Sequence, residues 1–128
     1  MTATFLVSAE AAFAAAHTLP GVDMCARMHG HNWRVRVTVQ IAPERLDAHG
    51  MGVDFRDLER YARAAVGEFE HRYLNELPAF QDRAPTAETI ARVVAERVAA
   101  ALAGHPSGAT LTEVELWEMA QYKVSYRP

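Results

Sequence analysis

Residues 33–41, Trp-Arg-Val-Arg-Val-Thr-Val-Gln-Ile, carry the clearest secondary-structure pattern in the chain. Apolar side chains occupy every odd position of this stretch, and polar side chains occupy every even position. Successive side chains of a β-strand point to opposite faces of a sheet, so the alternation predicts a strand with one apolar and one polar face. The apolar face needs a covering layer, which segments elsewhere in the chain can supply.

Three other segments are typical of strands, although none alternates as clearly. Residues 4–16 alternate weakly, and their many alanines favour a helix as readily as a strand. Near the end of the chain, residues 110–116 and 122–126 are expected to form two further strands. Residues 17–30 and 42–52 contain proline and glycine, so we expect loops there.

Two amphipathic segments predict helices. Residues 54–69 place apolar side chains at spacings of three and four, with Asp54 as the expected N-cap. This apolar stripe consists of Phe55, Leu58, Ala62, Ala65 and Phe69. The second helix is expected to begin after Thr86, another N-cap candidate, and to stop at Gly104-His105-Pro106. Residues 71–84, between the two helices, are expected to be irregular.

The predicted element order is β-β-α-α-β-β, which defines an α+β domain. Two amphipathic helices can cover one face of a four-stranded antiparallel sheet. A sheet this small keeps two open edges, and strand pairing between copies of the chain is a natural way to satisfy them. The chain has 128 residues and no repeat or linker, so residues 1–128 are expected to form a single domain.

Composition excludes several functional classes. Half of the residues are apolar and 23% are charged, which is an ordinary globular balance, and the formal net charge of -3 gives no reason to expect nucleic-acid binding. The single cysteine cannot form an intrachain disulfide, which fits a reducing compartment. No stretch reaches the roughly 18 apolar residues of a membrane span. We therefore expect a cytoplasmic protein with no membrane and no nucleic-acid partner.

The most informative residues for chemistry are His29-Gly30-His31, with His17 in the preceding segment. If this stretch is extended, the imidazoles of His29 and His31 point to the same side. Together with His17 they would form a three-histidine site with an open position, which is the arrangement of a catalytic zinc. Alternatively, a pair of histidines two residues apart is commonly a surface feature, and His17 could be a core histidine.

Three further residues each allow a structural and a functional interpretation. Cys25 could be a small buried hydrophobe, a reactive thiolate, or a fourth metal ligand that closes the site. His71 could be a helix-terminal histidine, or a proton-transfer residue oriented by the adjacent Glu70. Glu118 could keep an edge strand soluble, or bind the paired N–H donors of a pterin or guanine ring edge.

Taken together in order, the motifs resemble the 6-pyruvoyl-tetrahydropterin synthase and 6-carboxy-tetrahydropterin synthase (QueD) family from Phe13 to Tyr126. The markers are Phe13-Ala14-Ala15-Ala16-His17, Cys25 with His29-Gly30-His31, Gly50-Met51-Gly52-Val53-Asp54-Phe55, Glu70-His71-Arg72-Tyr73-Leu74-Asn75, Pro85-Thr86-Ala87-Glu88, and Glu118 with Tyr126. The resemblance implies the tunnelling fold (T-fold), in which β-β-α-α-β-β subunits associate into a barrel. It also implies a homo-oligomer, a trimer or a hexamer, with active sites between subunits.

The resemblance also implies a role for each matching residue. His17, His29 and His31 would bind Zn²⁺. Cys25 would be the thiolate general base, and His71 would be a proton relay that reaches in from a neighbouring subunit.

Three acidic or polar residues complete the implied site. Glu118 would anchor the pterin ring, and Thr86 and Glu88 would line the same pocket.

Glu70 departs from the family pattern, because the family usually has Asp before the histidine at position 71. The role of Glu70 in orienting His71 is therefore open. Gly52 also replaces a larger apolar residue.

The resemblance implies a zinc-dependent lyase whose substrate is 7,8-dihydroneopterin triphosphate. The three-residue gap between Cys25 and His29 resembles the 6-carboxy branch, which releases acetaldehyde and triphosphate and forms 6-carboxy-5,6,7,8-tetrahydropterin for 7-deazapurines such as queuosine. Two alternatives stay open. One is a 6-pyruvoyl-tetrahydropterin synthase, which stops after triphosphate elimination. The other is a non-catalytic paralogue that binds zinc or a pterin.

Overall fold

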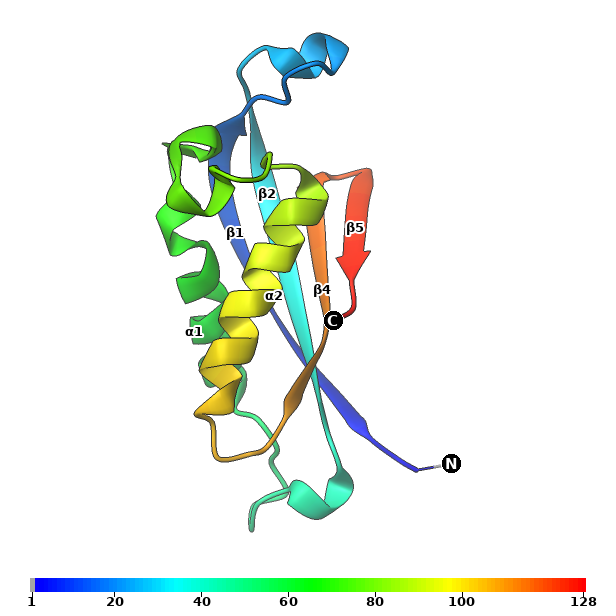
Figure 1. Ribbon diagram of the computed structural model, residues 1–128. Coiled ribbons are helices and arrows are strands. Elements are labelled where there is room, and N and C mark those ends of the chain that lie inside the picture. Colours follow the sequence, from blue (N-terminus) through cyan, green and yellow to red (C-terminus); the bar gives the residue numbers. More distant parts are fainter. Residues whose placement is uncertain (1) are drawn as a thin grey trace.

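The computed structural model describes residues 2–128 as one sheet with two α-helices packed on the same face (Figure 1). The helices are α1 (Phe55–Val66) and α2 (Ala87–Ala103). The strands are β1 (Phe5–His17), β2 (His29–Ile41), β3 (Arg72–Tyr73), β4 (Thr110–Met119) and β5 (Tyr122–Tyr126), in the spatial order β3-β1-β2-β4-β5. The expected α+β class and the placement of both helices on one face are confirmed.

The alternating stretch lies at the centre of the sheet, as its pattern predicts. β2 pairs antiparallel with β1 along its whole length, from Phe5 opposite Ile41 to His17 opposite His29, and with β4 on its other side. The valines of β2 are fully buried beneath the helices, whereas Arg34 on the other face is exposed. β2 begins at His29, so the strand also includes the histidine motif that was expected to end a loop.

The sheet has a fifth strand that the sequence pattern did not predict. β3 pairs parallel with the end of β1, with Ala15 opposite Arg72 and Ala16 opposite Tyr73. Two residues are too short to show any alternation, and tertiary contacts hold this strand in place. The most specific contact comes from Asn75, whose amide accepts from the Thr18 N–H (2.9 Å) and donates to the Thr18 carbonyl oxygen (3.0 Å).

Both helices begin at the N-caps expected from the sequence. The Asp54 carboxylate accepts from the Arg56 N–H at 2.8 Å, and the Thr86 hydroxyl accepts from the Thr89 N–H at 3.1 Å. These side chains satisfy N–H groups that have no partner in the first helical turn. α1 ends at Val66 and continues as a 3₁₀ turn over Gly67–Phe69.

The apolar stripe of α1 begins later than predicted. Leu58, Ala62, Ala65 and Phe69 are buried, but Phe55 is 69% exposed. Phe55 is the first residue of the helix and lines a surface hollow together with Met51. The spacing of apolar residues therefore overestimates the buried stripe by one position.

The core extends continuously to the end of the sheet that carries the histidines. Trp33 is fully buried, stacks on Phe13 with ring centroids 5.8 Å apart, and donates its indole N–H to the Ala15 carbonyl oxygen at 3.2 Å. Its ring also meets the edges of His17 and His31, at centroid distances of 5.1 and 5.2 Å. The histidine side chains are thus positioned by rigid core packing.

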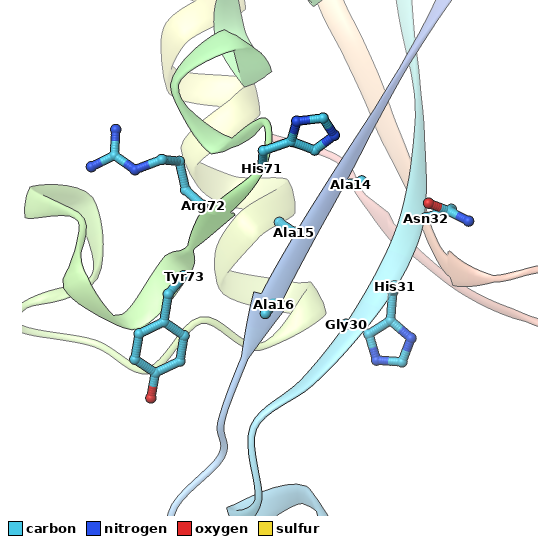
Figure 2. A pocket seen from close by; sticks show the side chains of 9 residues that line it. All are labelled: Ala14, Ala15, Ala16, Gly30, His31, Asn32, His71, Arg72 and Tyr73. Carbon is cyan, nitrogen blue, oxygen red and sulfur yellow. The ribbon is translucent and has the colours of Figure 1, made fainter.

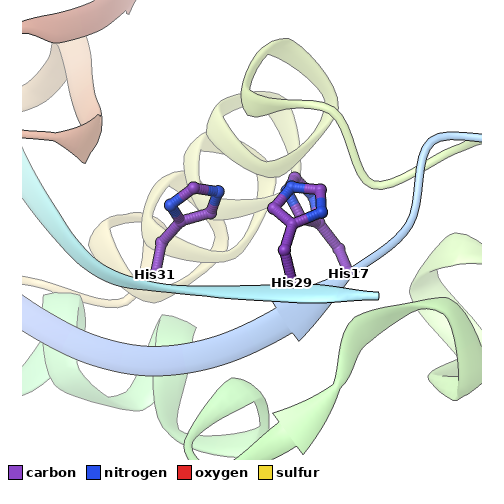
Figure 3. A group of neighbouring side chains, drawn as sticks. All are labelled: His17, His29 and His31. Carbon is purple, nitrogen blue, oxygen red and sulfur yellow. The ribbon is translucent and has the colours of Figure 1, made fainter. Parts of the chain in front are cut away.

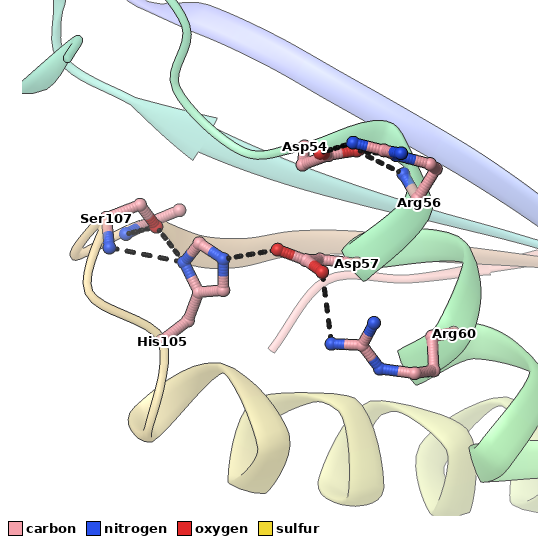
Figure 4. Close-up of polar contacts among 7 residues, drawn as sticks. Asp54, Arg56, Asp57, Arg60, His105 and Ser107 are labelled. Carbon is pink, nitrogen blue, oxygen red and sulfur yellow. Dashed lines mark hydrogen bonds and ion pairs between the residues drawn. The ribbon is translucent and has the colours of Figure 1, made fainter. Parts of the chain in front are cut away.

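A polar cluster joins the start of α1 to the loop after α2 (Figure 4). His105 Nε2 donates to the Asp57 carboxylate at 3.1 Å, while its Nδ1 accepts from the Ser107 N–H at 3.2 Å. The hydrogen bond from His105, followed by that from Arg60, lowers the pKa of Asp57. His105 follows the far end of the 17-residue α2, about 25 Å from the start of that helix, so this cluster is separate from the histidine group.

Candidate functional site

Three histidines converge at one end of the sheet, on the face covered by the helices (Figure 3). His17 is the last residue of β1, and His29 and His31 lie at the start of β2. One ring nitrogen of each lies within 4.8 Å of those of the other two. The i, i+2 spacing on β2 and the pairing of His17 with His29 bring these three rings together, as the sequence predicts.

Backbone carbonyl groups determine which nitrogen of two of these rings is free. His17 Nδ1 lies 2.8 Å from the Pro85 oxygen, and His29 Nδ1 lies 2.7 Å from the Arg27 oxygen. A carbonyl oxygen only accepts, so each Nδ1 carries the proton and each Nε2 keeps a lone pair. Metal-binding histidines are commonly oriented in this way by a second hydrogen bond.

The unsatisfied nitrogens fit a metal site. His17 Nε2 and His31 Nε2 are buried and have no hydrogen-bond partner among residues 2–128. A buried polar atom left without a partner costs about 1–3 kcal/mol. Burial is also the main cause that lowers the pKa of both His17 and His31, which favours the neutral form that binds metal. Three neutral imidazoles are a donor set suited to zinc and similar transition metals.

Glu118 lies beside the histidine group. It follows Val114 and Leu116 at two-residue spacing on β4, so it faces the same side of the sheet as these buried residues. Its Oε1 lies 3.3 Å from His31 Nε2, although the geometry is not that of a hydrogen bond. The carboxylate is 28% exposed and is therefore open to a ligand at the edge of the histidine group.

Cys25 lies in the loop between β1 and β2, in a 3₁₀ turn over Asp23–Ala26. Backbone hydrogen bonds hold this turn, from the Leu19 N–H to the Cys25 oxygen (2.6 Å) and from the Cys25 N–H to the Val22 oxygen (2.8 Å). The thiol is half-buried and does not belong to the group of close ligand atoms within residues 2–128. The arrangement therefore gives no support to Cys25 as a fourth metal ligand.

His71 and Glu70 form a pair at the edge of the sheet, apart from the three-histidine group. His71 Nε2 lies 3.2 Å from Glu70 Oε1, so the longer glutamate still reaches the imidazole. The His71 side chain is 81% exposed, and the residue has a left-handed backbone with φ of 57°. Figure 2 shows it at the rim of a cavity of about 500 Å³ beside β1 and β2. The pair faces outward, away from the core.

The start of α2 connects to the histidine group through its backbone. The Pro85 carbonyl that orients His17 directly precedes Thr86, whose hydroxyl is occupied as the N-cap. Glu88 is exposed on the first turn of the helix. The orienting carbonyls of Pro85 and Arg27 were not predicted, because a backbone carbonyl has no signature in the sequence.

Known proteins resemble this chain along its whole length. The family model for 6-pyruvoyl tetrahydropterin synthase matches residues 6–128. A 6-carboxy-5,6,7,8-tetrahydropterin synthase of Bacillus subtilis is 30% identical over 98% of this chain and 86% of its own. A dihydroneopterin monophosphate aldolase of Pyrococcus furiosus is 31% identical over 90% of each chain.

Solved structures also show this fold. The 6-pyruvoyl tetrahydropterin synthase of Caenorhabditis elegans superimposes with a TM-score of 0.82 at 21% identity, over 99% of this chain and 97% of its own. This likeness confirms the expected T-fold. Within residues 2–128, no helix is long and apolar enough to cross a membrane.

Proposed function

Because the chain belongs to the 6-pyruvoyl tetrahydropterin synthase family, we propose that it is a zinc-dependent lyase acting on 7,8-dihydroneopterin triphosphate. With one water consumed, its products would be 6-carboxy-5,6,7,8-tetrahydropterin, acetaldehyde and triphosphate. The observation that carries the proposal is the three-histidine group, in which two buried Nε2 atoms have no partner and a carboxylate lies alongside. A metal and the ring edge of a pterin would satisfy these groups together.

Two observations favour the 6-carboxy product. The Bacillus subtilis relative, which aligns with nearly the whole chain, is named for that product. Cys25 also precedes His29 by the short gap that resembles the same branch. The product would then feed the synthesis of 7-deazapurines such as queuosine, so the connection to tRNA would be metabolic.

The residues that would hold the metal are His17, His29 and His31. When bound, zinc supplies a Lewis acid that makes the hydroxyl groups of the substrate side chain, and the C–H bond beside them, more acidic. The donor set suits this role, because three protein ligands leave a coordination position for substrate.

The other residues would bind the ring and move protons. Glu118 would accept the paired N–H groups of the 2-amino-4-oxo ring edge, and Thr86 and Glu88 would line that end of the pocket. The Cys25 thiolate would remove a carbon-bound proton from the side chain. His71, oriented by Glu70, would return a proton to the substrate bound in an adjacent copy, since its side chain faces outward.

An assembly of several copies follows from the same reasoning. Within residues 2–128, β3 covers β1 only at Ala15 and Ala16, and β5 pairs only with β4. The part of β1 that β3 leaves uncovered and the outer edge of β5 therefore keep backbone groups available for pairing. A ring of copies can satisfy these groups. We propose a homo-oligomer, a trimer or a hexamer, in which His71 of one copy completes the site of the next.

Product identification tests the proposed function directly. Zinc-loaded protein is incubated with 7,8-dihydroneopterin triphosphate, and the pterin product is identified by mass. The 6-carboxy product together with acetaldehyde is the expected result. A 6-pyruvoyl product would assign the chain to the other branch with the same site. The absence of any turnover, with zinc bound, would contradict the proposed enzyme and favour a non-catalytic binding protein.

A further inference from the structure

Arg27 is a free cation beside the histidine group. Among residues 2–128, three arginines, Arg27, Arg72 and Arg92, have a guanidinium that makes neither an ion pair nor a hydrogen bond. Arg92 lies over the Tyr126 ring, 5.7 Å from its centroid. Arg72 lies on β3 at the sheet edge. Arg72 also lines the cavity that His31 borders, but of the three only Arg27 has a carbonyl oxygen that orients a histidine of the group, His29.

The chain places Arg27 beside the site. Its backbone is extended, with φ of -86° and ψ of 144°, and it lies two residues before the start of β2 at His29. His29 and His31 share one side of β2, and Arg27 continues their two-residue spacing just outside the strand. The Arg27 side chain is exposed, so its charge is available to a ligand.

The three kinds of group lie in a fixed order along the site. Glu118 lies next to His31 at one end, the histidines occupy the middle, and Arg27 lies two residues beyond His29 at the other end. Four residues of extended chain span roughly 13 Å, which is the longest separation possible between the Cα atoms of His31 and Arg27. The long arginine side chain can cover part of that distance. The order from one end to the other is therefore an anion, a metal group and a cation.

We propose that Arg27 binds the phosphate at the end of the substrate's side chain, and so selects pterins that carry a phosphate ester. This inference rests on the proposed function. Such a substrate has the matching order of groups: a ring edge of N–H donors, a short chain of hydroxyls, and a phosphate anion. An arginine guanidinium can donate two parallel hydrogen bonds to a phosphate, which makes it suited to this recognition.

The test measures binding of two ligands that differ only in phosphate. The dissociation constants of 7,8-dihydroneopterin triphosphate and of unphosphorylated 7,8-dihydroneopterin are measured by equilibrium dialysis with zinc-loaded Cys25→Ala protein, and mass analysis checks that the ligand stays intact. If the triphosphate is consumed, its KM for the same variants replaces the Kd. The substitutions compared in this background are Arg27→Gln, Arg27→Lys, Arg72→Gln and Arg63→Gln. Arg63 is the matched control, because it is an exposed arginine on α1 whose ion pair is with Glu59.

We expect Arg27→Gln to raise the Kd of the triphosphate by about 10- to 100-fold and to leave that of the unphosphorylated ligand within about twofold. Arg27→Lys keeps the charge but loses the paired donors, so it should recover part of the affinity. Arg63→Gln should change neither constant.

Several results would overturn the assignment of Arg27. They are an unchanged triphosphate Kd in Arg27→Gln, an equal loss for both ligands, a loss confined to Arg72→Gln, and a wild-type protein that binds both ligands equally or neither. The role of Arg27 and the proposed lyase activity can be tested separately. Phosphate-dependent binding that Arg27→Gln abolishes, in a protein that never turns the ligand over, would support Arg27 and contradict the lyase.

Discussion

At the scale of single residues, hydrogen bonds to the backbone decide which atoms can do chemistry. The Pro85 and Arg27 carbonyls each fix the proton of one imidazole on Nδ1, which leaves Nε2 free. Burial then keeps the rings neutral, because it lowers the pKa of His17 and His31. The chain itself thus holds the donor atoms of the proposed metal site in place.

Removing one imidazole should abolish metal binding. His31→Ala leaves only two histidine ligands, so zinc affinity should fall by more than the roughly 10- to 100-fold that loss of an outer hydrogen-bond partner costs. Zinc retained per subunit after dialysis against a chelator measures the effect. His49→Ala, which removes an exposed histidine outside the group, is the matched control. A His31→Ala protein that retains as much zinc as the control would contradict the assignment.

Cys25 should be needed for the reaction but not for the metal. Cys25→Ala removes the proposed base while the three histidines remain, so we expect turnover to be lost and the zinc content to stay unchanged. Rate and zinc content are measured on the same preparation, with Cys25→Ser as a second variant that keeps the size of the side chain. Full activity, or loss of the metal, would disprove this role.

At the scale of elements, the caps and strand ends position the site. Thr86 starts α2, and this places the Pro85 carbonyl against His17. The end of β1 and the start of β2 bring the histidines together because the two strands stay in register over their whole length. Glu118 reaches the group only because β4 extends beyond Leu116, where the predicted strand ended.

The N-cap of α1 should make stability depend on acid pH. The side-chain hydrogen bonds from Arg56, followed by its backbone N–H, lower the pKa of Asp54 from 3.8 to about 2. Because the folded pKa is the lower one, the stabilisation is present above about pH 4 and is lost as the pH falls towards 2. The free energy of unfolding of wild type and Asp54→Asn, measured in urea at several pH values, should therefore converge over this range.

The control for this prediction is Asp82→Asn, which replaces an exposed aspartate without a hydrogen-bond or ion-pair partner in residues 2–128. Its difference from wild type should stay constant across the same pH range. Asp57 and Asp47 also have lowered pKa values, so Asp54→Asn should reduce the acid sensitivity without removing it. A constant difference between wild type and Asp54→Asn would contradict the charge-dependent role of this cap.

At the scale of the whole molecule, the open edges of the sheet point to assembly. The Ala14 N–H lies 3.4 Å from Glu70 Oε1, and the Ala14 oxygen accepts from the His71 N–H at 2.7 Å, so both backbone groups face away from β2. Residues two apart in an antiparallel strand point their backbone groups the same way. The backbone groups of Ala12 therefore lie at the free edge of β1, where a second copy can pair.

Proline at this edge should block assembly and leave the subunit folded. Ala12→Pro removes one outward N–H, and proline is tolerated at the edge of a sheet. We expect the mass measured by sedimentation to fall from a multiple of three subunits to one subunit, with the far-ultraviolet circular dichroism unchanged. Ala12→Ser keeps the N–H and serves as the control. An Ala12→Pro protein that stays oligomeric would show that this edge is not the interface.

Local patterns were sufficient to predict most of the architecture. The strict alternation of residues 33–41 predicted the central strand, and Asp54 and Thr86 predicted both helix starts. These features depend on neighbours within a few residues, so the spacing of apolar residues and the capping side chains are enough to predict them. The histidine set was predicted for the same reason, since the i, i+2 spacing on an extended chain places His29 and His31 together.

Features that depend on distant contacts required the three-dimensional structure. β3 exists because the Asn75 amide pairs with Thr18, and a two-residue strand has no period to detect. The exposure of Phe55, the orienting carbonyl of Pro85 and the approach of Glu118 to His31 likewise arise from packing between elements far apart in the chain. The sequence by itself therefore predicted which side chains form the candidate site, because the chemistry of a side chain depends on its residue type. Their mutual placement, and the freedom of the Arg27 cation, depend on which distant partners the fold brings close or leaves apart.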